Sequence, residues 1–217
     1  LPDAVTTVVK GLRGRDEAFE LLICQNGSTD QTTAVASTLA SQYPEVTALD
    51  LNVADYGAAL RLGFLASRGD LVVNFDVDFV DLDFLSAAVV LLEQRHEISV
   101  VVGSKRSPDS HDRRRPGRRL VTAVFGLVLR HVFGLQVSDT HGLKALRRAR
   151  LAPLVEACQF GEDIFDTELI LRAERAGLGV AELPVTVDDQ RPPRTSIVGR
   201  IPRSLLGLAR LRLSLWR

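Results

Sequence analysis

Short apolar runs alternate along this chain with longer segments in which apolar residues recur at helical spacing. The runs that we predict as strands are 19–25, 45–51, 70–78 and 98–106, and the segments that we predict as helices are 3–13, 28–43, 56–69 and 81–95. Strands that alternate with helices are typical of crossover connections between parallel strands. The pattern therefore predicts an α/β domain with a mainly parallel sheet, covered by helices on both faces.

Polar clusters follow three of the predicted strands. They are NGSTD at 26–30, DVD at 76–78 and GSKR at 103–106. In sheets of this kind ligands bind in a crevice beyond the carboxyl ends of the strands. We therefore expect the three clusters to lie around a single binding crevice.

Four aspartates interrupt the otherwise apolar stretch 72–84, although burying an unpaired carboxylate is strongly unfavourable. Asp76 and Asp78 have a spacing that puts both on one face of an extended strand, where their oxygens suit a hard cation such as Mg²⁺ or Mn²⁺. With no His or Cys nearby, zinc is not favoured. The pattern fits equally a strand end followed by a capped helix, and we assign Asp81 and Asp83 to that helix start.

Composition adds little about partners. The 217 residues include 27 Lys and Arg and 27 Asp and Glu, so the net charge gives no sign of a nucleic-acid partner, and we expect none. Cys24 and Cys158 lie in apolar surroundings, and we expect two free thiols in a reducing compartment. Neither a signal peptide nor an apolar run of membrane-spanning length is expected. The sequence does not indicate the oligomeric state.

Basic residues gather at 106–119 and in the tail 191–217. In the tail, leucines alternate with arginines before Trp216, a pattern typical of an amphipathic helix on an anionic membrane surface. A terminal helix that packs on the domain or binds a partner protein is the alternative. We predict a domain at 1–190, followed by a loop and a basic membrane-surface helix at 191–217.

Several further motifs occur in an order that covers nearly the whole chain. They are QNGSTD at 25–30, a helix with Gly57, Ala59 and Gly63, DVD at 76–78, GSKR at 103–106, DTHGLK at 139–144 and FDTELILRAERAGLGVAELPV at 165–185. Neither a Walker-type loop nor the dinucleotide-binding glycine motif is present. Together the motifs resemble the family 2 glycosyltransferases of the GT-A fold, and most of all the polyprenyl-phosphate (dolichyl-phosphate) mannosyl- and glucosyltransferases.

This resemblance implies an inverting, metal-dependent transfer of mannose or glucose from a nucleotide-diphosphate sugar to a polyprenyl phosphate. It implies Mg²⁺ or Mn²⁺ bound by Asp76 and Asp78, and an enzyme that is cytoplasmic and peripheral on the inner face of the cell membrane. Two alternatives remain open: a saccharide acceptor with Asp163 as the base, and a non-catalytic protein that binds nucleotide sugars.

The resemblance also implies roles for individual residues. The implied catalytic residues are Asp78, Glu168 on a helix facing the crevice, and Asp163; those for the donor are Asn26, Ser28, Asp55, Asp76 and Asp139; those for the acceptor or for phosphate are Lys105, Arg106, Arg119, Arg191, Arg194 and Ser196. Lys105, Arg106 and Arg119 fit the acceptor phosphate, the donor diphosphate or a solvated basic loop. Guanidinium groups suit the last role because they bind phosphate oxygens in pairs.

The chain departs from the family pattern at three places. The family opens with a strand that would precede Leu1. It has an acidic pair where Gln25 and Asn26 stand here, and a lysine where Ile197 stands. The second departure leaves the choice of nucleobase open.

Overall fold

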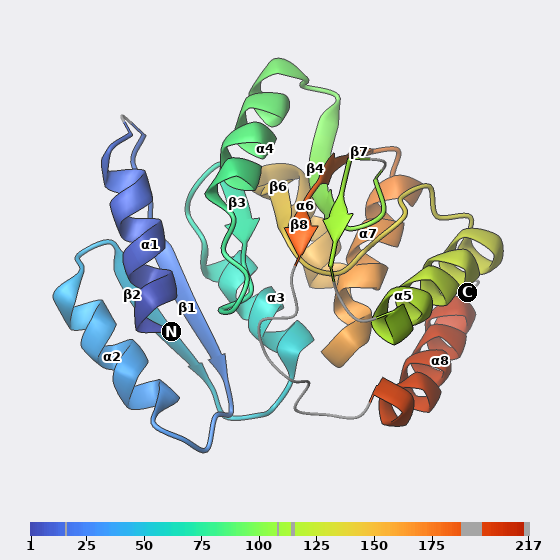
Figure 1. Cartoon of the computed structure of the whole chain (residues 1–217), viewed down its shortest axis with the longest axis horizontal. Coiled ribbons are helices and arrows are strands. Elements are labelled where there is room, and N and C mark those ends of the chain that lie inside the picture. Colours follow the sequence, from blue (N-terminus) through green and yellow to red (C-terminus); the bar gives the residue numbers. More distant parts are fainter. Residues whose placement is uncertain (16, 108, 114–115, 188–196, 215–217) are drawn as a thin grey trace.

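The structure, a computed structural model, describes the chain except residues 16, 108, 114–115, 188–196 and 215–217. Within its elements, the side chains of residues 112, 118, 163 and 197–203 also lie outside the description. Figure 1 shows a layered α/β arrangement, with a two-stranded sheet on one side and a larger sheet on the other. The predicted α/β class is confirmed.

The smaller sheet pairs β1 (Leu21–Asn26) with β2 (Val46–Leu51) in parallel, and Leu21 is opposite Val46. The helix α1 (Pro2–Arg13) covers it together with α2 (Thr32–Gln42), which connects the two strands. Val5 and Val9 of α1 pack against Ile23 and Leu39 because the helical spacing of the valines gives α1 one apolar face.

The larger sheet has the strand order β3, β6, β4, β7. These strands are Leu71–Asn74, Lys144–Arg147, Ile98–Ser104 and Gly179–Pro184, respectively. β4 and β7 are parallel, but β6 is antiparallel to both of its neighbours, so the sheet is mixed. The reason is that the segment after Ser104 stays at the carboxyl end of β4, and the chain then runs back through β6.

The central strand β4 is buried along its whole length. Its side chains alternate between two apolar clusters, since successive residues of a strand point to opposite faces. Val100 and Val102 face a cluster with α6 (Arg148–Ala157) and α7 (Phe165–Arg175), and Val101 faces a cluster with α4 (Leu82–Gln94). Helices thus cover both faces of the sheet, as predicted.

The helix α3 (Tyr56–Ala66) connects the two sheets. A Cβ added at Gly63 would lie 2.5 Å from Cys24 Sγ on β1, and one added at Gly57 would lie 2.6 Å from Phe165 Cβ on α7. Both glycines therefore permit a close approach that a larger residue would prevent. α3 ends at Ala66 with Ser67 as its C-cap, three residues before the expected Gly69.

Two further helices lie side by side at one end of the molecule (Figure 1). They are α5 (Pro116–Val128), continued by the π-helical turn η1 (Leu129–Phe133), and α8 (Ile197–Ser214). The short strands β5 (His111–Asp112) and β8 (Thr186–Val187) pair in parallel, and the 3-10 turn η2 (Glu162–Ile164) precedes α7.

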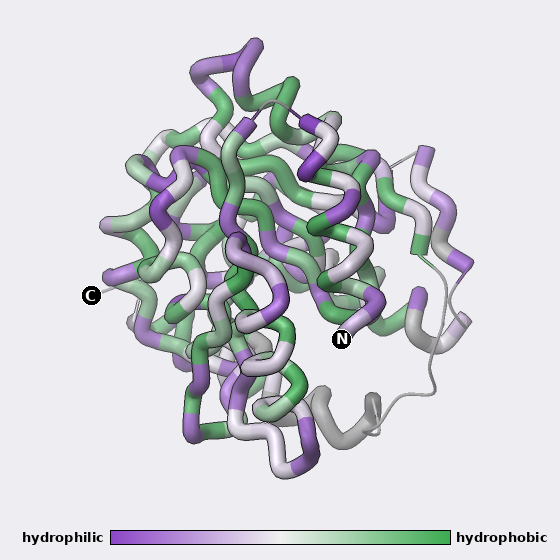
Figure 2. The backbone as a smooth tube through the Cα atoms, turned by 90° about the vertical axis from the view of Figure 1, so that its left-hand side faces the viewer, coloured by the Kyte–Doolittle hydropathy of each residue, from purple (hydrophilic) through white to green (hydrophobic). Residues whose placement is uncertain are grey.

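Of the helices described, none has the length and apolar character needed to cross a bilayer. Figure 2 shows hydrophobic and hydrophilic residues intermixed along the helices, as expected where one face packs on a core.

Candidate functional site

The predicted metal ligands lie in a tight turn beyond β3. The strand ends at Asn74, and Phe79 N donates to Asp76 O at 2.9 Å, so the extended geometry expected from the spacing of the two aspartates is not present. Asp76 is half-buried and Asp78 is exposed. The residues expected to start the next helix do so: Asp81 caps α4 by accepting from Phe84 N at 2.8 Å, and Asp83 lies in its first turn.

The two carboxylates suit a divalent cation in part. Their oxygens are the ligands that Mg²⁺ and Mn²⁺ prefer, and they reach solvent, where water and a diphosphate can complete the coordination. No group of three or more potential metal ligands from His, Cys, Asp and Glu occurs in the described part of the chain.

Tyr56, which the sequence reading had not singled out, supports the first aspartate. It is the first residue of α3, and its hydroxyl donates to Asp76 Oδ1 at 3.0 Å. This bond fixes one carboxylate oxygen, so the position of Asp76 depends on the start of α3.

The neighbouring Asp55 holds another part of the site. Its carboxylate caps α3 by accepting from Ala58 N at 2.9 Å, and the same oxygen accepts from Glu162 N at 2.6 Å. A Cβ added at Gly161 would lie 2.1 Å from Asp55 Oδ2, and Glu162 has the left-handed φ of 47°. Asp55 thus attaches the turn η2 to the start of α3. Because its carboxylate bonds to the backbone of both segments, we favour a role in positioning them over the predicted contact with the donor.

The turn after β1 is closed by a buried side chain. Gln25 is 7% exposed; its Oε1 accepts from Ser28 N at 2.8 Å, and its amide nitrogen donates to Asp50. The helix α2 begins at Thr32, later than the predicted start at 28, and has no side-chain cap. Asn26, at the end of β1, and Ser28 are both half-buried.

A continuous chain of contacts connects the three polar clusters. Gly27, with φ of 64°, leaves only 2.8 Å between an added Cβ and Ala54 N, so the first cluster packs against the segment leading into α3. Tyr56 then bonds to Asp76 in the second cluster. Asn74 Nδ2 donates to Gly142 O at 3.2 Å, and Gly142 lies against Lys105 of the third cluster.

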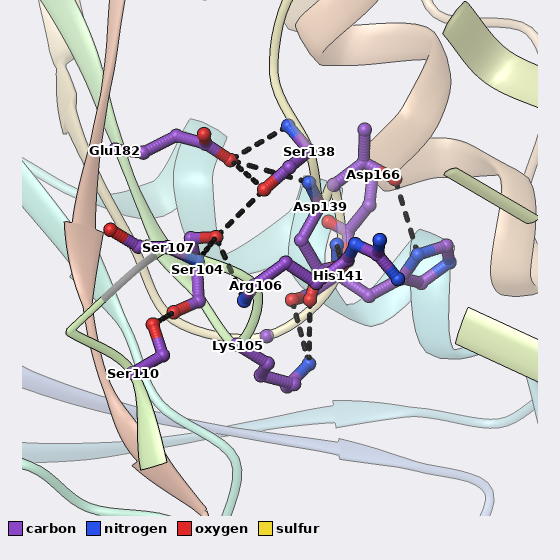
Figure 3. A network of polar contacts seen from close by, with 12 residues as sticks. Ser104, Lys105, Arg106, Ser107, Ser110, Ser138, Asp139, His141, Asp166 and Glu182 are labelled. Atoms are coloured by element: carbon purple, nitrogen blue, oxygen red, sulfur yellow. Dashed lines mark hydrogen bonds and ion pairs between the residues drawn. The ribbon is translucent and has the colours of Figure 1, made fainter. Parts of the chain in front are cut away.

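The third cluster is held by a hydroxyl and carboxylate network (Figure 3). Ser138 donates to Glu182 Oε1 through its backbone N at 2.8 Å and its Oγ at 2.7 Å. Its Oγ also lies 2.8 Å from Ser104 Oγ, which accepts from the backbone of Arg106 at 3.1 Å. Glu182, within β7, therefore orders the loop that presents the basic residues after β4.

Two lysine–aspartate pairs lie beside this network; Lys105 of the first is half-buried, and the second is fully buried. Lys105 Nζ lies 3.3 Å from Asp139 Oδ2 and donates to His141 O at 3.1 Å, while Asp139 Oδ1 accepts from His141 N at 3.0 Å (Figure 3). Lys144 Nζ lies 3.1 Å from Asp166 Oδ2. Lys144 and Asp166 are 1% and 2% exposed, so each neutralises the other in a site that water does not reach. The predicted donor residue Asp139 is likewise paired internally.

Three of the predicted phosphate-binding residues line one cavity of about 530 Å³: Lys105, Arg106 and Arg119. Ser107 and Ser110 add hydroxyl groups, and the first two turns of α5 form the opposite wall. The side chains of Arg106 and Arg119 are exposed. We call this cavity the cationic pocket, and its charge suits an anionic group.

Glu168 does not face a crevice, contrary to expectation. It is 0% exposed, and its Oε2 accepts from the backbone N–H groups of Gln159 and Phe160 at 2.9 Å each. Its Oε1 lies 2.7 Å from Arg172 Nη2, one helical turn along α7. Both oxygens are engaged inside the protein, which favours a structural role.

The two cysteines are free. Burial raises the pKa of the Cys24 thiol to about 11. Burial, reinforced by the negative charge of Glu168, raises the pKa of the Cys158 thiol to about 12. Neither thiol is a nucleophile near neutral pH.

Four predicted residues have side chains outside the described part of the chain: Asp163, Arg191, Arg194 and Ser196. The sequence reading also missed Tyr56, Glu182 and the Lys144–Asp166 pair. Lys144 and Asp166 both lie in the motifs quoted above, but only the fold brings the two motifs together.

The chain is similar to proteins of known classes. Residues 1–153 match the family model described as glycosyl transferase family 2. The chain is 28% identical over 210 residues to the glycosyltransferase AglD of Haloferax volcanii, and the match covers 92% of this chain and 32% of AglD. It is 28% identical over 214 residues to a dolichyl-phosphate beta-glucosyltransferase of Trichomonas vaginalis, and the match covers 93% of this chain and 65% of that enzyme.

A solved structure has the same fold. It is glucosyl-3-phosphoglycerate synthase of Mycobacterium tuberculosis in complex with Mn²⁺, uridine diphosphate and glucosyl-3-phosphoglycerate. The TM-score is 0.70 at 20% sequence identity, and the match covers 97% of this chain and 75% of the synthase. This confirms the expected GT-A architecture.

Proposed function

From the premise that this chain belongs to the family 2 glycosyltransferases, we propose that it transfers mannose or glucose from a nucleotide-diphosphate sugar to a polyprenyl phosphate. The observation that carries the proposal is the cationic pocket beside the polar edge of the sheet. A saccharide acceptor has no charge for the exposed Arg106 and Arg119 to neutralise, whereas a phosphate acceptor does; Lys105 is already paired with Asp139.

The donor side of the proposal rests on Asp76 and Asp78. Their carboxylates would hold Mg²⁺ or Mn²⁺, which when bound stabilises the negative charge of the departing diphosphate. Tyr56 keeps Asp76 in place for this role. Asn26 and Ser28, at the end of β1, are proposed to contact the nucleotide. The complex of the mycobacterial synthase with Mn²⁺ and uridine diphosphate supports this assignment.

The acceptor side needs charge rather than a strong base. A phosphate monoester is already deprotonated near neutral pH, so its oxygen can attack the anomeric carbon directly. The new bond to that carbon forms as its bond to the diphosphate oxygen breaks on the opposite side, which inverts the configuration. Arg106 and Arg119 would hold the phosphate in line, and positioning of this kind accounts for much of the rate.

A lipid acceptor requires a place at a membrane. We propose that the enzyme binds peripherally to the cytoplasmic face of the cell membrane through the basic helix α8. The dolichyl-phosphate beta-glucosyltransferase among the similar proteins supports a lipid phosphate as acceptor. Arg191, Arg194 and Ser196, between β8 and α8, are proposed to contribute to acceptor binding.

The test is a transfer assay across a panel of nucleotide sugars with Mn²⁺, with and without polyprenyl phosphate. Replacing Arg106 and Arg119 by Ala should raise the acceptor KM by about tenfold or more, because each hydrogen bond to a charged group is worth roughly 1.5–3 kcal/mol. Donor hydrolysis without acceptor should stay unchanged. Arg95→Ala, at the exposed end of α4, is the matched control.

A second candidate acceptor is a saccharide, with Asp163 as the base. The attachment of its turn η2 to Asp55 favours this alternative, because a base must be held in place. Under the phosphate proposal, Asp163→Asn retains transfer within a small factor of wild type. An inactive Asp163→Asn enzyme combined with normal Arg106 and Arg119 variants would instead indicate a saccharide.

A further inference from the structure

The helix α5 presents an apolar stripe to solvent. Leu120, Val124 and Leu127 are 65%, 52% and 55% exposed, and the helical repeat of about 3.6 residues places all three on one face. The opposite face packs inward: Phe125 meets the ring of His141 edge-on at 5.4 Å, and Leu129 is 2% exposed. The stripe is therefore an outer face with no partner among the described residues of the chain.

The helix α8 has a similar outer stripe. Leu205, Leu206 and Leu213 are 51%, 54% and 70% exposed, while Leu208 and Leu211 lie in the core at 4% and 0%. Arg212 connects the two helices: its guanidinium donates to Val132 O and lies 5.8 Å from the centre of the Phe133 ring. The two stripes thus belong to neighbouring helices, as Figure 1 shows.

Exposed apolar side chains concentrate on this part of the surface. In the described part of the chain, the large hydrophobic residues that are exposed include four on α5 and η1 and three on α8. The rest of the described chain has four, dispersed over separate segments as Val53, Leu65, Val77 and Val90. Scattered residues of that kind are ordinary, but a concentration on two adjacent helices indicates a binding surface.

The charge of the two helices is of one sign. Residues 116–133 and 197–214 contain no Asp or Glu. The arginines in these ranges are Arg118, Arg119, Arg130, Arg200, Arg203, Arg210 and Arg212. Arg119 and Arg130 flank the stripe of α5, and Arg210 lies next to that of α8, all three exposed. Leucine faces bordered by arginine complement the hydrocarbon and the phosphates of an anionic bilayer.

We infer that α5 and α8 together form a docking surface for an anionic lipid bilayer. This surface adds α5 to the membrane contact proposed above for α8, and it rests on that part of the proposed function. Arg119 and Leu120 of α5 also line the cationic pocket. The pocket therefore opens beside the stripe, where a phosphate carried by a membrane lipid can enter it without leaving the bilayer surface.

Vesicle flotation tests this surface. The whole chain is mixed with vesicles of phosphatidylcholine, with and without phosphatidylglycerol. The variant carries Val124→Gln and Leu127→Gln, which lie in the stripe and outside the pocket. The matched control carries Leu65→Gln and Val90→Gln, which are helical residues exposed to 43% and 47% on α3 and α4.

The chain should float with the phosphatidylglycerol vesicles, and less so as salt is added, because surface charges are screened. The stripe variant should bind them at least about tenfold more weakly, since it loses two apolar contacts with the lipid, and the control should bind normally. Val124→Trp with Leu127→Trp should strengthen binding, which separates loss of contact from loss of fold.

Equal binding by the stripe variant, or no binding to any vesicle, overturns the inference. Self-association of the lipid-free chain that the same glutamines abolish, measured by light scattering, would show instead that a second copy covers the stripe. Hydrolysis of the donor in free solution does not need the surface. If the stripe variant still hydrolyses the donor, its weak vesicle binding reflects loss of the docking surface. Loss of donor hydrolysis in the wild-type chain would count against the proposed enzymatic function instead.

Discussion

The hydroxyl of Tyr56 illustrates how one atom connects two parts of this site. It is carried by the first residue of α3 and reaches Asp76, while the preceding residue, Asp55, holds the turn that carries Asp163. A two-residue segment therefore positions both the proposed metal ligand and the alternative catalytic base. A shift of α3 would displace the two together.

Removing this hydroxyl should weaken donor binding. Tyr56→Phe loses one hydrogen bond to a carboxylate, worth about 1.5–3 kcal/mol, so the Kd for nucleotide diphosphate with Mn²⁺ should rise about tenfold or more. Calorimetry measures this Kd. Tyr43→Phe is the control, because the other tyrosine lies far from the site and pairs with Thr6 at 3.4 Å. Equal affinity in wild type and Tyr56→Phe would remove Tyr56 from the site.

The two thiols offer a separate test at the residue scale. Their pKa values of about 11 and about 12 leave almost no thiolate at pH 8, so native Cys24 and Cys158 should resist a thiol reagent that labels both in urea. Because folding raises both values, the stability that this provides is present below the unfolded pKa, about 8.5, and is lost as the pH rises above it. Rapid labelling of the folded chain would contradict the raised pKa values of Cys24, which is half-buried, and Cys158, which is buried.

At the scale of the element, α7 is defined by the polar residues that it buries. Asp166, Thr167 and Glu168 are at most 2% exposed, and each has a partner on another segment or one turn along the helix. Glu168 holds the backbone that enters the η2 turn from the end of α6. The helix thus orders the loop before it.

Glu168→Gln should lower stability more than catalysis. The amide keeps an acceptor but leaves Arg172 without its charged partner, and we expect a loss of about 1–3 kcal/mol in the free energy of unfolding. Urea denaturation measures this loss. The turnover of the folded enzyme, with its concentration measured separately, should stay close to wild type. Normal stability with abolished turnover would restore the catalytic role implied by the family resemblance.

The sequence predicted most elements because their signals are local. The valines of α1 and the capping Asp81 of α4 act within one helix, and both predictions are confirmed. The strand β6 was not predicted, and neither its antiparallel direction nor the burial of Glu168 could be, because they depend on contacts with distant segments. The clustering of Lys105, Arg106 and Arg119 was only partly predictable, since it needs the β4 loop and α5 to meet.

At the scale of the whole molecule, the proposed metal ligands and the proposed lipid-docking surface lie on different elements. The proposed metal ligands lie at the end of β3, while the cationic pocket leads to α5 and the outer stripes. Under the proposed function, such a chain would bind its donor from water and its acceptor from a membrane. In the described part of the chain, contacts of α3 with Asp76 and of Asn74 with Gly142 connect the proposed metal ligands to Lys105 of the cationic pocket.

The division of the strands into two sheets has a consequence for local unfolding. Among the described strands, β1 pairs only with β2, whereas β4 lies between β6 and β7. In a strand with one partner, alternate amides lack a ladder bond, and a small sheet opens more readily than a central one. Amide hydrogen exchange should therefore be faster throughout β1 and β2 than in β4.

Gly63→Ala should widen that difference. The new methyl group would lie 2.5 Å from Cys24 Sγ, so the thiol must rotate away from α3 or α3 and β1 must move apart. Exchange should accelerate in β1 and β2 while β4 keeps its protection, as mass spectrometry of peptic fragments would resolve. Uniform acceleration across all strands would mean that the chain opens as a single cooperative unit. Faster exchange in β1 and β2 alone would show that the β1–β2 sheet opens independently of the larger sheet. Binding of the donor to the proposed contacts at the end of β1 could then stabilise this sheet separately.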